Sequence, residues 1–354
     1  MFRPPTHATR ARIGLALASV AVAGCAAGPT SSAQTSSAPA STTGAGSGSG
    51  SGRIVYQGDG LTVVGADGVD KHPLLVDGSI SGNHPDWSPD GRSIAFEVEE
   101  QTDGTGDLWV VRADGTQPRR IFDCSRPCQL AQSPAWSPDG TRIAYSWSEF
   151  PPSVTQVLRV LDVATGRDVE TFTFPSFVGV TDPRWSPDGT RIAYTAQRFA
   201  GPADDPHLVD GAVGVLDVSG APTNGHAITP WRILGSYPAW SPRGDRIIFQ
   251  AGDETPFDLT DPGSSGRTSD LWIVRPDGSG LRQLTHQGPS DPRLFGPDWG
   301  GGPHPVRVAI LAADGSSLVL GMLDPDGTHL QPLIDDSSGQ PLGGAHPRWT
   351  SAGS

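Results

Sequence analysis

A short motif, P-x-W-S-P-D-G-x-x-I-A-F/Y, recurs along most of the chain and constrains its fold more than any other feature. Three copies are nearly perfect, a fourth is close, and the last two are worn or truncated. They read PDWSPDGRSIAF (85–96), PAWSPDGTRIAY (134–145), PRWSPDGTRIAY (183–194), PAWSPRGDRIIF (238–249), PDWGGGPHPVRVAIL (297–311) and PRWTSAGS (347–354). The six tryptophans are 49 to 59 residues apart, a period typical of β-propeller blades.

Each copy predicts a β-hairpin. In S-P-D-G the proline fixes φ at the second turn position, and the glycine follows where a positive φ is expected. The residues after the turn, such as Arg191 to Tyr194, alternate polar and apolar as a half-buried strand does. The tryptophan before the turn is a large apolar side chain that we expect to pack between neighbouring sheets.

A second hairpin follows each copy, with a β-rich run, an Asp-Gly or Thr-Gly turn and a short closing strand. Examples are DLWVVRADGTQPRRIF at 107–122 and DLWIVRPDGSGLRQLT at 270–285. Two hairpins make a four-stranded blade. The last copy lacks its second strand, and Arg53 to Tyr56 (RIVY) resembles that missing strand. We therefore predict an all-β, six-bladed β-propeller over residues 53–354, closed by strands from both termini.

The repeat resembles that of the TolB family of β-propellers, and the resemblance covers nearly all of residues 53–354. It implies an exported, non-catalytic, protein-binding module of the cell envelope. Peptidoglycan-associated lipoproteins and translocating proteins would be its partners. The chain departs from the family in its eroded fifth repeat. It also carries a signal-like segment and a linker where the family has a separate α/β domain.

The N-terminus predicts export. A basic segment, Met1 to Arg12, precedes an 11-residue apolar run that is too short to span a bilayer. The run ends in Val-Ala-Gly-Cys, which resembles a bacterial lipobox, so residues 1–24 are predicted to be a lipoprotein signal peptide and Cys25 the acylated residue. The alternative is an ordinary signal peptide cut near Ala27. The uncharged, Gly/Ser/Ala/Thr-rich stretch that follows, to residue 52, is predicted to be a disordered tether.

These predictions place the propeller at the outer face of the bacterial cytoplasmic membrane, or at an outer membrane if the organism has one. The membrane is contacted through the lipid alone. The two remaining cysteines, Cys124 and Cys128, are expected to form a local disulfide in such a compartment. Half of a metal site is the alternative, but no second Cys or His pair lies near them in the sequence.

Composition narrows the class of partner. The formal net charge of −13 repels phosphate backbones, so we expect no nucleic-acid partner. The 46 glycines and 34 prolines favour many short elements joined by turns and argue against a helical bundle. We expect a monomer that binds an envelope protein or peptide.

One position of the repeat predicts a site. The residues just before each P-x-W, or its equivalent, should encircle one mouth of the propeller channel; they are His84, Ser133, Asp182, Tyr237, Gly296 and His346. Among them His84, Asp182, Tyr237 and His346 are the candidate binding residues. The two histidines and Asp182 fit a metal or carboxylate-binding cluster. The plainer alternative is that both histidines cap strands or bind water.

We expect the long loops within and between blades to lie on the same face of the propeller as this ring. Those within blades are residues 97–106, 146–156, 195–212 and 250–269, and those between blades include 123–133 and 173–182. Several carry acidic residues, Glu97 among them, which we interpret as solubilising surface charge.

We expect no enzymatic activity and no cofactor. Propellers accompany the catalytic domain of prolyl-oligopeptidase-like proteases, but the sequence contains no G-x-S-x-G nucleophile motif. The alternative function is a metal-dependent polysaccharide lyase or a carbohydrate-binding propeller. Oligogalacturonate lyases hold a metal through histidines at the channel mouth, and His84 and His346 keep this alternative open.

Overall fold

The computed structural model describes a set of segments within residues 52–350. They are 52–58, 60–75, 82–99, 105–149, 156–175, 178–201, 207–218, 225–252, 269–288, 291–300, 308–313 and 318–350. All of them belong to the second of two compact units into which the chain divides, Gly48–Ser354. The predicted signal peptide, Cys25 and the predicted tether up to residue 51 lie outside the described residues.

The all-β prediction is confirmed. Apart from one short 3₁₀ helix, η1 (Trp231–Ile233), the regular elements of the described residues are strands. The first twelve are β1 (Arg53–Gly58), β2 (Gly60–Gly65), β3 (His72–Pro73), β4 (Gly82–Trp87), β5 (Ser93–Glu99), β6 (Gly106–Arg112), β7 (Arg119–Phe122), β8 (Cys128–Trp136), β9 (Arg142–Glu149), β10 (Gln156–Asp162), β11 (Arg167–Thr173) and β12 (Val178–Trp185). The rest are β13 (Arg191–Ala200), β14 (His207–Asp217), β15 (His226–Ala227), β16 (Ser236–Trp240), β17 (Ile247–Gly252), β18 (Ser269–Val274), β19 (Arg282–Gln283), β20 (Arg293–Trp299), β21 (Val308–Ala313), β22 (Leu318–Leu323), β23 (Gln331–Pro332) and β24 (Ala345–Trp349).

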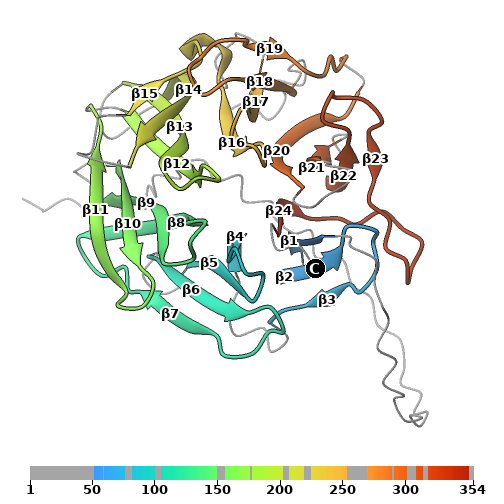
Figure 1. Cartoon of the computed structure of the whole chain (residues 1–354), viewed down its shortest axis with the longest axis horizontal. Coiled ribbons are helices and arrows are strands. Elements are labelled where there is room, and N and C mark those ends of the chain that lie inside the picture. The colour runs from blue at the N-terminus through green and yellow to red at the C-terminus, as the bar shows by residue number, and fades with distance from the viewer. Residues whose placement is uncertain are drawn as a thin grey trace, which may run out of the picture. The chain divides into compact units, whose positions relative to one another are not determined.

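These strands pair as antiparallel four-stranded units, each named here by its first, P-x-W-bearing strand. Within the described residues the units are β4-β5-β6-β7, β8-β9-β10-β11, β12-β13-β14-β15, β16-β17-β18-β19, β20-β21-β22-β23 and β24-β1-β2-β3. The β4 and β8 units share one larger sheet, because Gly106 makes a single parallel pairing with Leu130. The units stand around a common centre, with the first strands innermost and the short fourth strands outside (Figure 1).

The β24 unit joins the two ends of the propeller sequence. Strand β1 lies between β24 and β2, with Ile54 opposite Trp349 on one side and Val64 on the other. The first described strand is thus an internal strand, and its backbone groups are paired on both edges.

The turn chemistry follows the sequence. Gly91, Gly140 and Gly189 have φ values of 65°, 73° and 70°, as predicted for the last residue of S-P-D-G. In the first copy the Ser88 hydroxyl donates to Asp90, and the Ser93 N–H donates to the Ser88 hydroxyl. The hydrogen bond from Ser88 lowers the pKa of Asp90, so the turn contains an ionised carboxylate at neutral pH.

Tryptophans of the repeat pack between neighbouring units, as predicted. Trp87 of the β4 unit lies in one buried cluster with Val55 and Val63 of the β24 unit. The same motif adds a contact that the sequence analysis missed. The arginine that opens the second strand lies over the tryptophan of the next unit; the pairs are Arg53 with Trp87 at 4.8 Å, Arg142 with Trp185 at 4.7 Å and Arg191 with Trp240 at 4.9 Å.

The prediction of long loops within the units was partly wrong. Strand β13 runs to Ala200 and β14 starts at His207, so most of the predicted 195–212 loop is a paired hairpin extension. The polar sequence of this hairpin favours a loop prediction. In the structure, Arg198 of β13 lies opposite Asp210 of β14, and the two side chains form an ion pair at 3.3 Å. The 97–106, 146–156 and 250–269 loops are also shortened at their ends by β5, β6, β9, β17 and β18. Between units, β8 and β12 likewise begin inside the predicted loops 123–133 and 173–182.

No helix among the described residues has the length and apolar character needed to cross a membrane.

Candidate functional site

Each first strand contains a backbone irregularity at the residue before its proline. The pairing register shifts there, for example between Asn83 and Asp86 of β4 and between Thr181 and Arg184 of β12. The residues at this position share a φ between 46° and 53°; they are His84, Ser133, Asp182, Tyr237, Gly296 and His346. Five of the six are not glycine, and such left-handed residues cost on the order of 1–3 kcal/mol each. Backbone strain of this kind is concentrated at functional sites more often than elsewhere.

These irregularities bring the four predicted site residues together at the centre. The ring centroids of His84 and His346 are 4.1 Å apart, and those of Tyr237 and His346 are 6.0 Å apart. Asp182 is close enough to influence the pKa of both His84 and Tyr237. It accepts a hydrogen bond from the Ser133 hydroxyl at 3.2 Å. We call His84, Asp182, Tyr237 and His346 the channel-mouth cluster.

His84 forms a hydrogen bond with Glu97, a residue that the sequence pattern indicated to be a surface loop charge. Its Nδ1 lies 2.9 Å from the Glu97 carboxylate, and both side chains are buried. The interpretation of Glu97 as a solubilising loop charge was therefore wrong, because Glu97 belongs to β5 and faces inward. Burial alone would lower the pKa of His84, but the hydrogen bond and the charge of Glu97 outweigh it and raise that pKa.

The second histidine has the opposite character. Burial, the charge of His84 and the charge of Arg184 all lower the pKa of His346, so this imidazole is neutral at neutral pH. Among the described residues neither the His346 ring nor the Tyr237 hydroxyl has a hydrogen-bond partner. The cluster thus combines an imidazole with a raised pKa, an imidazole with a lowered pKa, a phenol and a carboxyl group within one small region.

A second ring of side chains comes from the middle residue of P-x-W. In order around the units these residues are Asp86, Ala135, Arg184, Ala239, Asp298 and Arg348. Alignment of the copies shows that four of these six residues are charged, a pattern that does not enter the sequence-based prediction of the site. Arg184 and Arg348 are 8% and 3% exposed, so this ring contains two buried cations.

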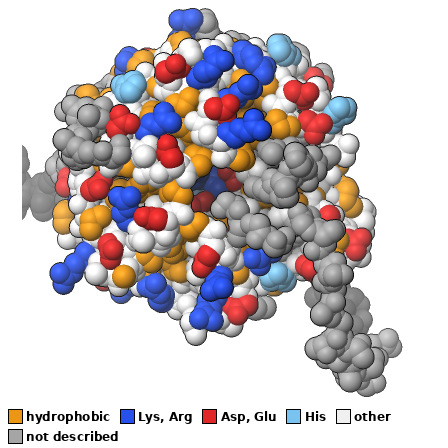
Figure 2. All heavy atoms as spheres, viewed as in Figure 1, with side chains coloured by type: hydrophobic (Ala, Val, Ile, Leu, Met, Phe, Trp, Pro, Cys, Tyr) orange, Lys and Arg blue, Asp and Glu red, His pale blue; other side chains and the backbone are white. Residues whose placement is uncertain are grey.

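The aspartates of the second ring connect units. The Asp86 carboxylate accepts a hydrogen bond from the backbone N–H of Trp136 at 2.7 Å. The Asp298 carboxylate accepts one from the backbone N–H of Trp349 at 2.6 Å. Each donor belongs to the next unit around the ring. Burial raises the pKa of Asp86 to about 6 and that of Asp298 to about 7, against the opposing charge of Arg184. Figure 2 shows a hollow at the middle of this face with cationic and acidic atoms inside it.

The described residues contain no group of three His, Cys, Asp or Glu side chains arranged as a metal site. The channel-mouth cluster can hold a ligand through hydrogen bonds and charge. Its histidine pair supplies two of the ligands that a metal would need.

Cys124 and Cys128 form a disulfide with Cα atoms 5.2 Å apart. Cys124 follows β7, the last strand of the β4 unit, and Cys128 is the first residue of β8, the first strand of the next unit. Both cysteines are buried, and the Cys124 N–H donates to Asp107 at 2.7 Å. This disulfide belongs to the connection between units, away from the channel-mouth cluster in the sequence.

The chain matches no protein-family model and no curated protein. It is similar in fold to the crystal structure of TolB from Acinetobacter baumannii, with a TM-score of 0.58 and 17% identity over 84% of this chain and 66% of that one. A putative TolB from Agrobacterium tumefaciens gives 0.54 and 19%, over 84% and 91%. An oligogalacturonate lyase in complex with manganese gives 0.50 and 15%, over 80% and 74%. At these identities the likeness shows a shared propeller fold.

The raised pKa of Asp298 predicts a pH-dependent stability. Because the folded pKa of about 7 lies above the ordinary aspartate pKa of 3.8, the charge of Asp298 destabilises the fold progressively as the pH rises from 4 to 7. Asp298→Asn keeps an acceptor for the Trp349 N–H and removes that charge. We expect the variant to be more stable than the parent by on the order of 1–3 kcal/mol at pH 8 and about equal at pH 4.5. Urea unfolding at the two pH values measures this difference.

Asp139→Asn is the matched control, because hydrogen bonds from Ser137 and Thr141 lower the pKa of Asp139. Its carboxylate stabilises the fold at pH values above its unfolded pKa of about 4, so this variant should be less stable than the parent at both pH 8 and pH 4.5. If Asp298→Asn were less stable than the parent at pH 8, the conclusion that the buried Asp298 charge destabilises the fold would be contradicted.

Proposed function

We propose that this chain is a non-catalytic binding protein of the cell envelope whose channel-mouth cluster receives a segment of a protein or peptide partner. The observation that carries the proposal is the convergence of polar side chains from four first strands on one central region. Their hydrogen-bonding groups are only partly used within the described residues. A ring of fixed donors and acceptors on a rigid sheet is the arrangement expected of a recognition site.

The chemistry of the cluster suits a peptide. The neutral His346 ring and the Tyr237 hydroxyl can each accept or donate a hydrogen bond, as the amide groups of a peptide require. His84 and Glu97 are hydrogen-bonded to each other, and Asp182 accepts a hydrogen bond from Ser133. The cluster therefore needs no fixed ionic partner. The similarity in fold to TolB structures supports an envelope role.

A pull-down from envelope extract tests the binding function. The bait is the propeller, compared with a His84→Asn/His346→Asn variant. Asparagine is chosen because it tolerates the left-handed backbone that both positions adopt. We expect a specific protein to be retained by the parent and reduced at least tenfold by the variant, since the two side chains that face each other at the mouth are removed.

The control variant is His226→Asn/His329→Asn, which removes two exposed histidines outside the first strands and keeps asparagine at the left-handed His329 position. It should retain the partner fully. Failure of the parent to retain any specific protein, or equal retention by the channel variant, would contradict the proposed binding site.

A metal-dependent polysaccharide lyase, or a carbohydrate-binding propeller, is the second candidate function. Two observations favour it: the 4.1 Å separation of the His84 and His346 rings, and the similarity in fold to a manganese-bound oligogalacturonate lyase. Metal analysis of the same proteins separates the two candidates. Stoichiometric manganese or zinc in the parent, lost in the His84→Asn/His346→Asn variant, would support the second candidate and overturn the first.

We also propose that acylation of Cys25 anchors the chain at the outer face of the membrane. The sequence Val-Ala-Gly-Cys after an apolar run supports this assignment. Cys25→Ser should abolish incorporation of labelled palmitate and move the protein from the membrane to the soluble fraction of the cell envelope. A variant that kept the label or stayed with the membrane would show that Cys25 is not the anchor.

A further inference from the structure

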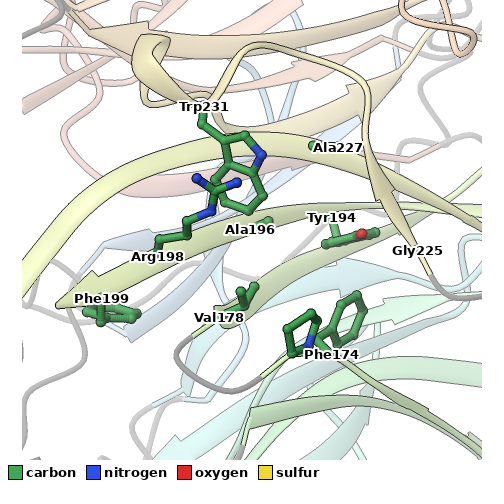
Figure 3. Close-up of a pocket in the computed structure, with 10 residues that line it drawn as sticks. Phe174, Val178, Tyr194, Ala196, Arg198, Phe199, Gly225, Ala227 and Trp231 are labelled. Atoms are coloured by element: carbon green, nitrogen blue, oxygen red, sulfur yellow. The ribbon is translucent and has the colours of Figure 1, made fainter.

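A cavity of about 380 Å³ lies at the β12 unit. Its walls come from the first, second and fourth strands of that unit, from η1 and from Phe174, which follows β11 (Figure 3). The volume falls within the range of small-molecule sites, roughly 300–1,000 Å³. The channel-mouth cluster supplies none of its lining residues.

The lining is mainly aromatic. Phe174, Tyr194, Phe199 and Trp231 line the space, and the Phe174 and Tyr194 rings are 5.0 Å apart at 58°. Such a lining provides faces and edges for one more flat ring. A planar aromatic guest therefore fits the walls better than a branched aliphatic one.

Tyr194 supplies a polar group within this lining. The residue as a whole is 2% exposed. The equivalent tyrosine of the neighbouring unit, Tyr145, donates to Asp168 at 2.7 Å. The Tyr194 hydroxyl can likewise donate a hydrogen bond, here to a polar atom of a ligand in the cavity.

Two glycines make room for the Tyr194 phenol. A Cβ atom at Gly214 would lie 2.3 Å from the ring, and one at Gly225 would lie 2.3 Å from the hydroxyl. Figure 3 shows the hydroxyl on the Gly225 side of the space. The position of this donor is thus determined by two close backbone approaches.

Arg198 determines the charge of the guest. Its guanidinium lies 3.8 Å from the centre of the Trp231 ring, while one nitrogen contacts Asp210 at 3.3 Å. The side chain is 47% exposed, so it lies at the open side of the cavity. Aromatic cages often bind cations, but here a cation already covers the Trp231 face. The remaining guanidinium donors favour a carboxylate.

We propose that this cavity binds a small aromatic carboxylate. The ring of the guest lies among Phe174, Tyr194 and Phe199, and its carboxylate accepts hydrogen bonds from Arg198. The Tyr194 hydroxyl donates to a polar atom of the guest. A guest of this size is expected to bind with a Kd on the order of 10–500 µM. This site is independent of the peptide-binding function proposed above.

Isothermal titration calorimetry with indole-3-acetate as the probe tests the site. We expect saturable binding by the parent, weakened about tenfold by Arg198→Gln and at least tenfold by Ala227→Leu, which fills the cavity with a larger side chain. Tyr145→Phe, which alters the tyrosine equivalent to Tyr194 in the neighbouring unit, should leave binding unchanged. Thermal unfolding of each variant verifies that the fold is intact.

Two further probes isolate the charge. Indole-3-acetamide, which lacks the carboxylate charge, should bind about tenfold more weakly than the acetate, and cationic tryptamine should bind more weakly still. The proposal is overturned if the parent shows no saturable binding up to millimolar acetate. It is also overturned if tryptamine binds as tightly as the acetate, or if Arg198→Gln and Ala227→Leu both bind like the parent.

Discussion

The left-handed residue before each proline of the first strands is the constraint on which the centre of this structure depends. It shifts the pairing register within the strand, and it does so at equivalent positions around the ring. A regular strand would place alternate side chains on opposite faces of the sheet. The irregularity instead brings His84, Tyr237 and His346 close together. The backbone strain recurs in the five units whose residue at this position is not glycine, so the packing between units must stabilise it.

That packing comes from the same motif. Trp87 fills the space between two units, and Arg53 of the neighbouring unit lies over its indole ring. The indole N–H of Trp240 donates to the Arg184 carbonyl at 3.0 Å, which links the centre of one unit to the apolar interface of the next. Asp86 and Asp298 add hydrogen bonds in the same direction around the ring. The repeat therefore encodes the unit, its interface and the polar centre within about twelve residues.

Because one short motif encodes these features, much of the fold could be predicted from the sequence. The all-β fold and the turn glycines follow from local chemistry, since S-P-D-G and alternating strands carry their own signals. The register of the channel-mouth cluster follows from the repeat. The partnership of Glu97 with His84 does not, because an acidic residue near the end of a strand looks solvent-exposed until its neighbour across the sheet is known. The extended hairpin of β13 and β14 could not be predicted for a similar reason. Arg198 and Asp210 look like loop residues in the sequence, and only the structure shows that they pair across the two strands. The cavity of the β12 unit depends on Gly214, Gly225 and the three-residue helix η1, and these features are not part of the repeat motif.

Two histidines from adjacent units meet in the channel-mouth cluster, where their surroundings shift the two pKa values in opposite directions. An NMR titration of the histidine rings measures these shifts, with His84→Asn and His346→Asn spectra to assign the signals. We expect the pKa of His84 to lie above 6.5 and that of His346 well below it. Removing His84 should also raise the pKa of His346, because one source of positive charge is lost. Two histidines that both titrate near 6.5, each unaffected by loss of the other, would contradict the cluster.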